Sequence, residues 1–492
     1  METGNPYESP SSAENTPLGS GDGSSTPDYR RPFITITMLF FLWGFITVMN
    51  DVLIPYLKES FELSFFQAGL VQFAFFGAFF VVSLLYYIIS LATGDPINRI
   101  GYKTSVIVAL MVCGAGCALF YPAAEYRTYS YFLGALFVLA TGVTLLQIAA
   151  NPYAAILGKP ETASSRLNLA QGVNSLGTTL APIAGGLLLY KVFAQGGEVT
   201  IDSIKVPYLI YGGMFVVLAV IVWLSQLPKF TNEEKLESGL GAFEFSHLRF
   251  GMIAIFMYVG GEVAIGSYLV NFMMAPEVLG LPEATASIYL AYYWGGAMIG
   301  RLCGAISLSD IENQGKKYLY MVLTAIAVFL VVYLVTAIRL DEGALSFEFM
   351  AITQVAPFLL LIGLNFIAFV IGRGKPAFSL GVFSIVLIAL LAVAAFADGN
   401  VAFWAALGTG LFNSIMWSNI FTLAIKDLKQ YTSQGSSLLV MMIVGGALIP
   451  LVMGYAADEL GIQHAFAVPI ICYLYIAFYG FFGYRVKQVQ TV

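Results

Sequence analysis

The sequence predicts an all-α integral membrane protein whose fourteen membrane-spanning helices form two repeated halves. Hydrophobic residues make up 59% of the 492 residues, and charged residues only 11%. The mean hydropathy of +0.81 is far above that of soluble domains of this length. Apolar windows of about 20 residues, long enough to cross a bilayer, recur along the chain. The lipid bilayer is therefore an expected partner, and nucleic acid is not.

The first 32 residues are predicted to form a disordered cytoplasmic tail. Residues 1–28 are rich in Ser, Gly, Pro, Thr and Asn, and they contain neither helical periodicity nor the apolar core of a signal peptide. Arg30 and Arg31 directly precede the first apolar run, which favours a cytoplasmic N-terminus. Residues 485–492 are expected to form a short C-terminal tail on the same side.

Six spans are expected in an N-terminal bundle, residues 33–228, and eight in a C-terminal bundle, residues 249–484. The polar segment 229–248 between them predicts a cytoplasmic linker. The expected spans cover residues 33–57, 65–92, 104–122, 131–157, 167–192, 207–227, 249–274, 284–307, 318–338, 346–372, 376–397, 400–424, 434–457 and 464–484.

The placement of charge supports this count. With fourteen spans, seventeen of the 23 Lys and Arg residues lie in segments on the side of the N-terminus, and five lie on the opposite side. Cytoplasmic loops are enriched in Lys and Arg. Removing any single span would invert the orientation of every later loop, so an even count is required.

An internal repeat relates the two halves. Asp51 aligns with Glu262 at an offset of 211 residues (262 − 51), and Gly177 aligns with Gly445 at an offset of 268 (445 − 177). The difference of 57 residues (268 − 211) is about the length of two helices with their loops. We therefore expect two six-helix bundles related by pseudo-twofold symmetry, with an extra helical pair at about 318–372 between the eighth and ninth core helices. Repeated halves around a midplane site are typical of secondary transporters.

Asp51 and Glu262 are predicted to be the ion-coupling acids. Carboxylates within membrane spans are energetically costly and functional by default. Each could instead be a structural acid paired with a backbone or amide donor. A desolvated carboxylate can carry a proton, or it can bind sodium together with amide and carbonyl oxygens. No other metal site is expected, since the four cysteines lie in apolar runs far from either histidine.

Carboxamide side chains are unusually dense in the predicted membrane interior. Amides both donate and accept hydrogen bonds, as vicinal sugar hydroxyls do, so we predict a polar ligand; hydrogen bonding between helices is the alternative for any single residue. Indole rings of Trp43 and Trp417 could stack on a pyranose or simply pack. The predicted substrate-binding residues are Asn50, Gln72, Gln147, Asn151, Gln171, Asn174, Asn271, Asn413 and Trp417.

Arg99 and Lys103, in the basic turn between the second and third spans, are predicted to act in gating; a plain cytoplasmic turn explains them nearly as well. No phosphate-binding loop, Ser/His/Asp set or zinc-ligand spacing is present in the sequence. We therefore expect neither an enzyme nor a cofactor.

Several of these segments carry a family resemblance. The chain resembles the major facilitator superfamily and, within it, the fucose/galactose/glucose:cation symporters, especially the glucose/galactose transporter branch. The motifs are FLWGF with NDVLIP (within 40–55), QAGLVQFAFFGAFF (67–80), NRIGYK (98–103), FYPAAE (120–125), LLQIAANPY (145–153), SRLNLAQGVNSLGT (165–178), YVGGEVAIGS (258–267) and TSQGSSLL (432–439).

The resemblance implies a transporter that imports a monosaccharide with a coupled cation, Na⁺ or H⁺, by alternating access. We expect it to be a monomer in a bacterial inner membrane. The resemblance matches Asp51 to the family's helix-one aspartate. Fucose/proton members carry a glutamate where this chain has Gln147, and an amide where it has Glu262, so their mechanism cannot be transferred whole. The alternatives are a symporter for another sugar such as fucose, or a non-transporting sugar receptor on the same scaffold; a polytopic membrane enzyme is a third, weaker alternative.

Overall fold

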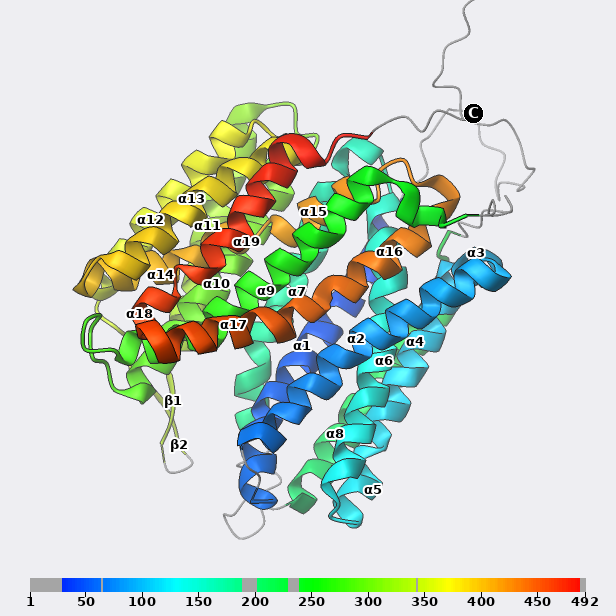
Figure 1. Ribbon diagram of the computed structural model, residues 1–492, viewed down its shortest axis with the longest axis horizontal. Helices are drawn as coiled ribbons and strands as arrows, with labels where there is room; N and C mark the ends of the chain where they lie inside the picture. The colour runs from blue at the N-terminus through cyan, green and yellow to red at the C-terminus, as the bar shows by residue number, and fades with distance from the viewer. Residues whose placement is uncertain (1–28, 63–64, 188–200, 229–238, 342–343, 487–492) are drawn as a thin grey trace, which may run out of the picture.

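The protein is almost entirely helical, as predicted, with its helices gathered in two bundles (Figure 1). The computed structural model describes residues 29–62, 65–187, 201–228, 239–341 and 344–486. The side chains of Asn50, Asp51 and Gln72 lie outside this description, as do most of both expected tails and half of the expected linker.

The first half contains the helices that precede the linker. They are α1 (Arg30–Ser60), α2 (Phe65–Thr93), α3 (Pro96–Ile100), α4 (Tyr102–Ala118), α5 (Phe120–Glu125), α6 (Tyr129–Ile156), η1 (Pro160–Thr162), α7 (Ala163–Leu187), η3 (Ile201–Ile204) and α8 (Lys205–Leu224).

The second half follows the linker. It comprises η4 (Gly241–Glu244), α9 (Ser246–Met274), α10 (Glu283–Ser307), α11 (Gln314–Ala337), β1 (Ile338–Asp341), β2 (Ala344–Phe347), α12 (Ile352–Gly372), α13 (Pro376–Phe396), α14 (Gly399–Asn413), α15 (Met416–Ala424), η5 (Lys429–Tyr431), α16 (Thr432–Met441), η6 (Met442–Val444), α17 (Gly445–Leu460), α18 (Ile462–Ala465), α19 (Val468–Phe478) and η7 (Tyr479–Gly483).

Within the described ranges, 11 segments are long and apolar enough to cross a membrane. Three further helical elements run between them: α7, α10 and the α14–α15 pair, which is interrupted after Asn413. Helices α7 and α10 are less apolar than most of the other spans, and the break after Asn413 leaves α14 and α15 with only 15 and 9 residues. Taken together, they make the structure consistent with the fourteen expected spans.

Helix packing repeats between the halves. In the first half α1 packs on α7, α4 on α6 and α8, and α2 on α6. The second half matches these contacts with α9 on α17, α13 on α14 and α19, and α10 on α14. Helices α11 and α12 have no counterpart in the first half and lie at the outer edge of the second (Figure 1). The extra helical pair is therefore peripheral to the core bundles.

A short antiparallel hairpin joins the two extra helices, which the sequence analysis did not predict. Ile338 pairs with Phe347, and Asp341 with Ala344. The span expected to begin at residue 346 therefore begins later, at Ile352. Apolar and polar residues alternate along the first strand, a pattern of period two that favours a strand over a helix.

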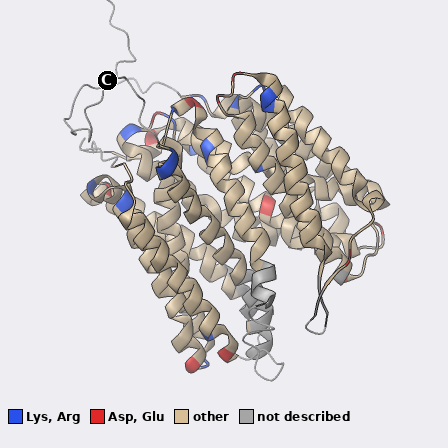
Figure 2. Ribbon diagram, turned by 180° about the vertical axis from the view of Figure 1, so that it is seen from behind, with Lys and Arg blue, Asp and Glu red and all other residues tan. Residues whose placement is uncertain are grey.

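The two ends of the bundle differ in charge. Lys and Arg gather at the end of the bundle that carries α3, called here the α3 end (Figure 2). The opposite end, which carries the β1–β2 hairpin and α5, is called the hairpin end (Figure 1). This asymmetry matches the expected orientation, in which the α3 end faces the cytoplasm.

Two repeat-related glycines allow a close helix approach, one in each half. Gly177 lies where α7 crosses α1, and a Cβ on it would lie 2.3 Å from the carbonyl oxygen of Phe41. A Cβ on Gly445 would lie 2.1 Å from the carbonyl oxygen of Phe256, joining α17 to α9. Small residues at such crossings let membrane helices pack without an intervening side chain.

Gly445→Ala is expected to lower thermal stability, because its methyl group must displace backbone rather than a flexible side chain. Overpacking of this kind costs about 1–3 kcal/mol. The measurement is the melting temperature of the purified protein in detergent. Gly213→Ala is the matched control, since nothing lies within 4 Å of its added Cβ; equal melting temperatures for the two variants would contradict the prediction.

Candidate functional site

A buried ion pair lies inside the second half. Glu262 on α9 and Arg301 on α10 are only 9% and 8% exposed, and Arg301 Nη2 lies 3.2 Å from Glu262 Oε1. Arg301 also donates to Tyr258 Oη at 3.3 Å, to Ser175 Oγ at 2.6 Å and to the Ser414 carbonyl at 3.3 Å. A buried charge is tolerated when it is paired and its other donors are satisfied, and both conditions are met.

Hydrogen bonds extend this pair across the second half. Tyr293 Oη donates to the Glu262 carbonyl at 3.0 Å, Asn413 Nδ2 donates to Tyr293 Oη at 3.0 Å, and Tyr473 Oη donates to Asn413 Oδ1 at 2.7 Å. These residues come from α9, α10, α14 and α19. The amide of Asn413, predicted to bind substrate, is thus engaged through both its nitrogen and its oxygen.

Arg301 also connects the two halves. Its bond to Ser175 reaches α7 of the first half, where Ser175 follows the predicted ligands Gln171 and Asn174. The ion pair therefore lies where the bundles meet. A movement of one bundle against the other must break or exchange this bond.

Four of the amides predicted in the first half have described side chains, and all four are buried, but they differ in what they bind. Asn151 on α6 donates to the Gln147 carbonyl at 3.0 Å, and its Oδ1 is without a partner. Asn174 donates to the Phe40 carbonyl of α1 at 2.8 Å. In the described part of the chain, the side-chain amides of Gln147 and Gln171 make no hydrogen bond. Asn174 is therefore engaged between helices, whereas the two glutamines retain donors and acceptors.

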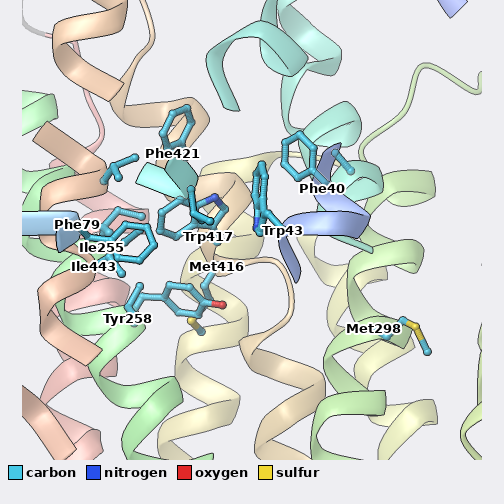
Figure 3. Close-up of a cluster of buried hydrophobic side chains, with 14 of the residues drawn as sticks. Phe40, Trp43, Phe79, Ile255, Tyr258, Met298, Met416, Trp417, Phe421 and Ile443 are labelled. Atoms are coloured by element: carbon cyan, nitrogen blue, oxygen red, sulfur yellow. The ribbon is translucent and has the colours of Figure 1, made fainter. Parts of the chain in front are cut away.

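Aromatic side chains from both halves form a buried cluster (Figure 3). The rings of Phe40 and Trp43 on α1 are 4.1 Å apart, and those of Trp417 and Phe421 on α15 are 6.0 Å apart. Trp417 is 6% exposed, and its Nε1 has no hydrogen-bond partner. An unpaired buried indole N–H is costly, so this donor is available to a ligand.

Three predicted ligands and one coupling acid are not placed at this network. The backbones of Asn50 and Asp51 belong to α1, and that of Gln72 to α2, but their side chains lie outside the described residues. Asn271 is exposed and lines a separate hollow of about 410 Å³ with Tyr268 and Asp458.

Hydrogen bonds between the halves are numerous toward the α3 end. Asn168 Nδ2 donates to Asn419 Oδ1 at 3.1 Å, and Ser164 and Thr422 share a bond of 2.6 Å. Ser436 Oγ donates to the Ile148 carbonyl at 2.9 Å. These contacts hold the two bundles together on that side of the ion pair.

The turn that was predicted to act in gating makes further contacts between the halves. Asn98 Nδ2 donates to the Gln430 carbonyl at 2.9 Å, and Gln434 Nε2 donates to Ser90 Oγ at 2.9 Å. The two predicted gating bases lie nearby: Arg99 is exposed, and Lys103 donates to backbone carbonyls at the end of α8, within its own half. Beside this turn, amide groups rather than the two bases therefore make the contacts between the halves.

Asp95 organises this turn, and the sequence analysis did not single it out. It caps α3 by accepting from the Ile97 N–H at 2.9 Å and the Asn98 N–H at 3.2 Å, and it accepts from Tyr86 Oη at 2.7 Å. Burial raises the pKa of the Asp95 carboxyl, and these hydrogen bonds oppose the shift. An Asp followed directly by Pro at the first helical position is an N-cap signal that the sequence contained.

Arg301 was also missed, although the sequence held a signal for it. Twenty-two of the 23 Lys and Arg residues lie in the expected loops or at their edges, and Arg301 alone falls in the middle of an expected span. Charged residues inside membrane spans are costly, and this argument, which singled out Asp51 and Glu262, applies equally to a base such as Arg301.

Gln434→Ala is expected to loosen the α3 end, because Gln434 also accepts from the Ala242 N–H at 3.0 Å. Each lost bond is worth about 1 kcal/mol, or roughly fivefold in an equilibrium. The accessibility of a cysteine at the interface reports this loosening. In a Ser164→Cys background, thiol labelling should be several-fold higher when Gln434→Ala is added. Gln463→Ala is the matched control, since this buried amide bonds only to carbonyls of its own half; equal labelling of the two variants would contradict the role given to Gln434.

Comparison with known proteins agrees with this architecture. Residues 33–371 match the model of the Major Facilitator Superfamily. The chain belongs to this superfamily. Its relatives are transporters and not enzymes.

The sequence relatives are sugar transporters by name. The chain is 42% identical to a glucose/galactose transporter of Brucella abortus over 95% of this chain and 98% of the relative. It is 38% identical to a putative glucose/galactose transporter of Helicobacter pylori, over 92% and 97%. It is 29% identical to the L-fucose-proton symporter of Escherichia coli, over 94% and 95%.

A solved structure has the same fold. The crystal structure of the major facilitator transporter FucP in the outward conformation superposes with a TM-score of 0.70 and 27% sequence identity, covering 94% of this chain and all of that one.

Proposed function

We propose that this superfamily member is a cation-coupled symporter that imports a monosaccharide of the glucose/galactose type by alternating access. The observation that carries the proposal is the buried Glu262–Arg301 pair, which reaches the opposite half through Ser175. A charged pair at the interface of two repeated bundles is expected at a midplane transport site. The names of the sequence relatives support a sugar as the substrate.

The uncommitted polar groups near this interface are suited to bind a sugar. Gln147 and Gln171 retain free amides, Asn151 retains a free oxygen, and Trp417 retains a free N–H. Because Asn174 and Asn413 are engaged in bonds between helices, we assign them to positioning rather than to direct sugar contact. Hydroxyl groups, which donate and accept together, complement this set.

Asp51 is proposed as the group that takes up the coupled cation. Its repeat-related partner Glu262 is already paired with Arg301. Glu262 can join a shared cation site only if Arg301 donates its hydrogen bonds to other acceptors. Arg301 already donates to Ser175, which is one such acceptor. The fucose relative is named a proton symporter, which supports H⁺; two acids with amide oxygens also suit Na⁺.

Cross-bundle bonds at the α3 end support a state closed on that side. The structural relative with a TM-score of 0.70 is described as outward, which agrees with closure at the end where Lys and Arg gather. We propose that this end faces the cytoplasm of a bacterium, with both termini on that side of the inner membrane.

Asp51→Asn is expected to abolish gradient-driven accumulation of labelled hexose in liposomes while sparing sugar counterflow, because an amide cannot take up a proton or hold a cation by charge. The assay compares labelled glucose, galactose and fucose with Na⁺ and H⁺ gradients imposed separately. Asp458→Asn, at an exposed acid of the hairpin end, is the control. Full accumulation by the Asp51 variant would refute the coupling role, and absence of sugar uptake by the unaltered protein would favour a receptor.

Arg301→Gln is expected to destabilise the protein more than the double variant Glu262→Gln/Arg301→Gln. Removing one partner leaves a buried charge unpaired, which costs about 3–5 kcal/mol, whereas the double variant leaves two neutral amides. Melting temperatures measure this, and uptake under each gradient tests coupling. If Glu262→Gln leaves the ion dependence of uptake unchanged, Asp51 and Glu262 do not share a cation site.

A further inference from the structure

An apolar pocket of about 330 Å³ lies between the extra helices and the core of the second half, away from the ion pair. Helices α10, α11 and α12 line it, with Cys303, Met321, Phe329, Leu359 and Phe369 among the lining side chains. Asn365 is the polar residue in this lining, and its Nδ2 is engaged by the Leu411 carbonyl at 2.9 Å. The lining is suited to hydrocarbon and unsuited to a sugar.

The rim of the pocket faces outward from the bundle. Val322, Ile326 and Leu359 line the pocket and are 41%, 52% and 41% exposed. In a chain whose outer surface is in contact with lipid, these side chains meet acyl chains rather than water. The opening is therefore to the bilayer.

Basic residues lie at the α3 end of the same helices. Lys316 stands in the first turn of α11, Arg373 caps the end of α12, and Lys375 precedes α13; all three are exposed. The buried Lys317 donates to the carbonyls of Ser307 and Ser309 at the end of α10, and the turn after Arg373 approaches the same Ser307 carbonyl. These contacts gather the four bases above the three helices that form the pocket.

Acidic residues only partly offset this charge. Asp310 and Glu312 precede α11 and are exposed. Asp310 lies 3.9 Å from Lys159 of the other half. The segment from 307 to 375 at this end therefore carries an excess of positive charge.

The spacing between bases and pocket matches the depth of a lipid. At about 1.5 Å per helical residue, Met321 lies about 7 Å and Phe329 about 20 Å below Lys316. Helix α12 runs in the opposite direction, and along it Phe369 lies about 6 Å and Leu359 about 21 Å from Arg373, again toward the middle of the bilayer. Headgroup layers are about 5–7 Å thick, and one leaflet of hydrocarbon is about 15 Å thick. Both helices thus place the bases at headgroup level and the pocket at acyl level.

We propose that this pocket holds one acyl chain of an anionic phospholipid, whose headgroup is bound by Lys316, Arg373 and Lys375. Anionic headgroups are attracted to basic clusters at the membrane surface. On α10, the lining residues Ile299 and Cys303 stand two positions before and after Arg301, and so lie on the opposite face of the helix. The lipid would therefore support the rear of the helix that presents Arg301 to the ion pair.

Photo-crosslinking tests the acyl part of the proposal. The full-length protein is reconstituted with phosphatidylglycerol carrying a diazirine in its acyl chain, and labelled peptides are mapped by mass spectrometry. Labels are expected to concentrate in 321–329 and 359–369. Gly363→Leu, which places a side chain in the pocket where nothing lies within 4 Å of an added Cβ, should reduce this labelling several-fold.

Gly213→Leu is the matched control, because it adds the same side chain to an exposed glycine of α8 with equally open surroundings. Both variants are first checked for unchanged melting temperature and elution. Equal labelling of the two variants, labels spread evenly over the lipid-facing helices, or crosslinks from this face to a second copy of the chain would each overturn the proposal.

The headgroup part is tested by substitution and by lipid exchange. Lys316→Gln and Arg373→Gln should each weaken labelling by phosphatidylglycerol about fivefold. Arg249→Gln, at an exposed base of the same end on α9, should leave it unchanged. A phosphatidylethanolamine probe with the same acyl chain should label more weakly and be insensitive to these substitutions; equal labelling by both lipids would refute recognition of the headgroup.

Discussion

The structure depends on the requirement that a charge buried at membrane depth be compensated. Glu262 and Arg301 meet this requirement for each other at 3.2 Å, and the remaining donors of Arg301 are taken up by a hydroxyl of the opposite half, a tyrosine and a carbonyl. Removing any one partner leaves a costly group without water to solvate it. The positions of α7, α9 and α10 are consequently tied to one another through this pair.

The same requirement separates the amides into two groups. Asn168 donates to Asn419, Asn174 donates to the Phe40 carbonyl, and Asn413 bonds to two tyrosine hydroxyls, so these three amides act between helices. The side chains of Gln147 and Gln171 remain uncommitted at similar burial. Hydrogen-bonding capacity that folding leaves unused is available to a ligand, which is why we propose a binding role for the two glutamines and a structural role for the engaged asparagines.

The extra helices show that the repeated architecture tolerates an addition at its margin. Helices α11 and α12 pack on the outer face of α10, α13 and α14 without entering the interface between the halves. Their hairpin closes the pair at one end, while their bases lie at the other. The addition therefore changes the surface that meets lipid, and it leaves the contacts of the ion pair to the core helices.

The sequence by itself determined the membrane class, the repeated halves, the inserted pair and the position of Glu262 inside a membrane span, because each depends on composition, length or spacing along one chain. It also contained Arg301 and Asp95 as an intramembrane base and a helix cap. Only the tertiary structure decided that Glu262 pairs with Arg301, 39 residues away on a neighbouring helix, and that Asn98 and Gln434, rather than Arg99 and Lys103, provide the contacts across the interface. Such pairings depend on how each helix is rotated about its axis, and in helices that are apolar on nearly every face the sequence pattern does not specify that rotation.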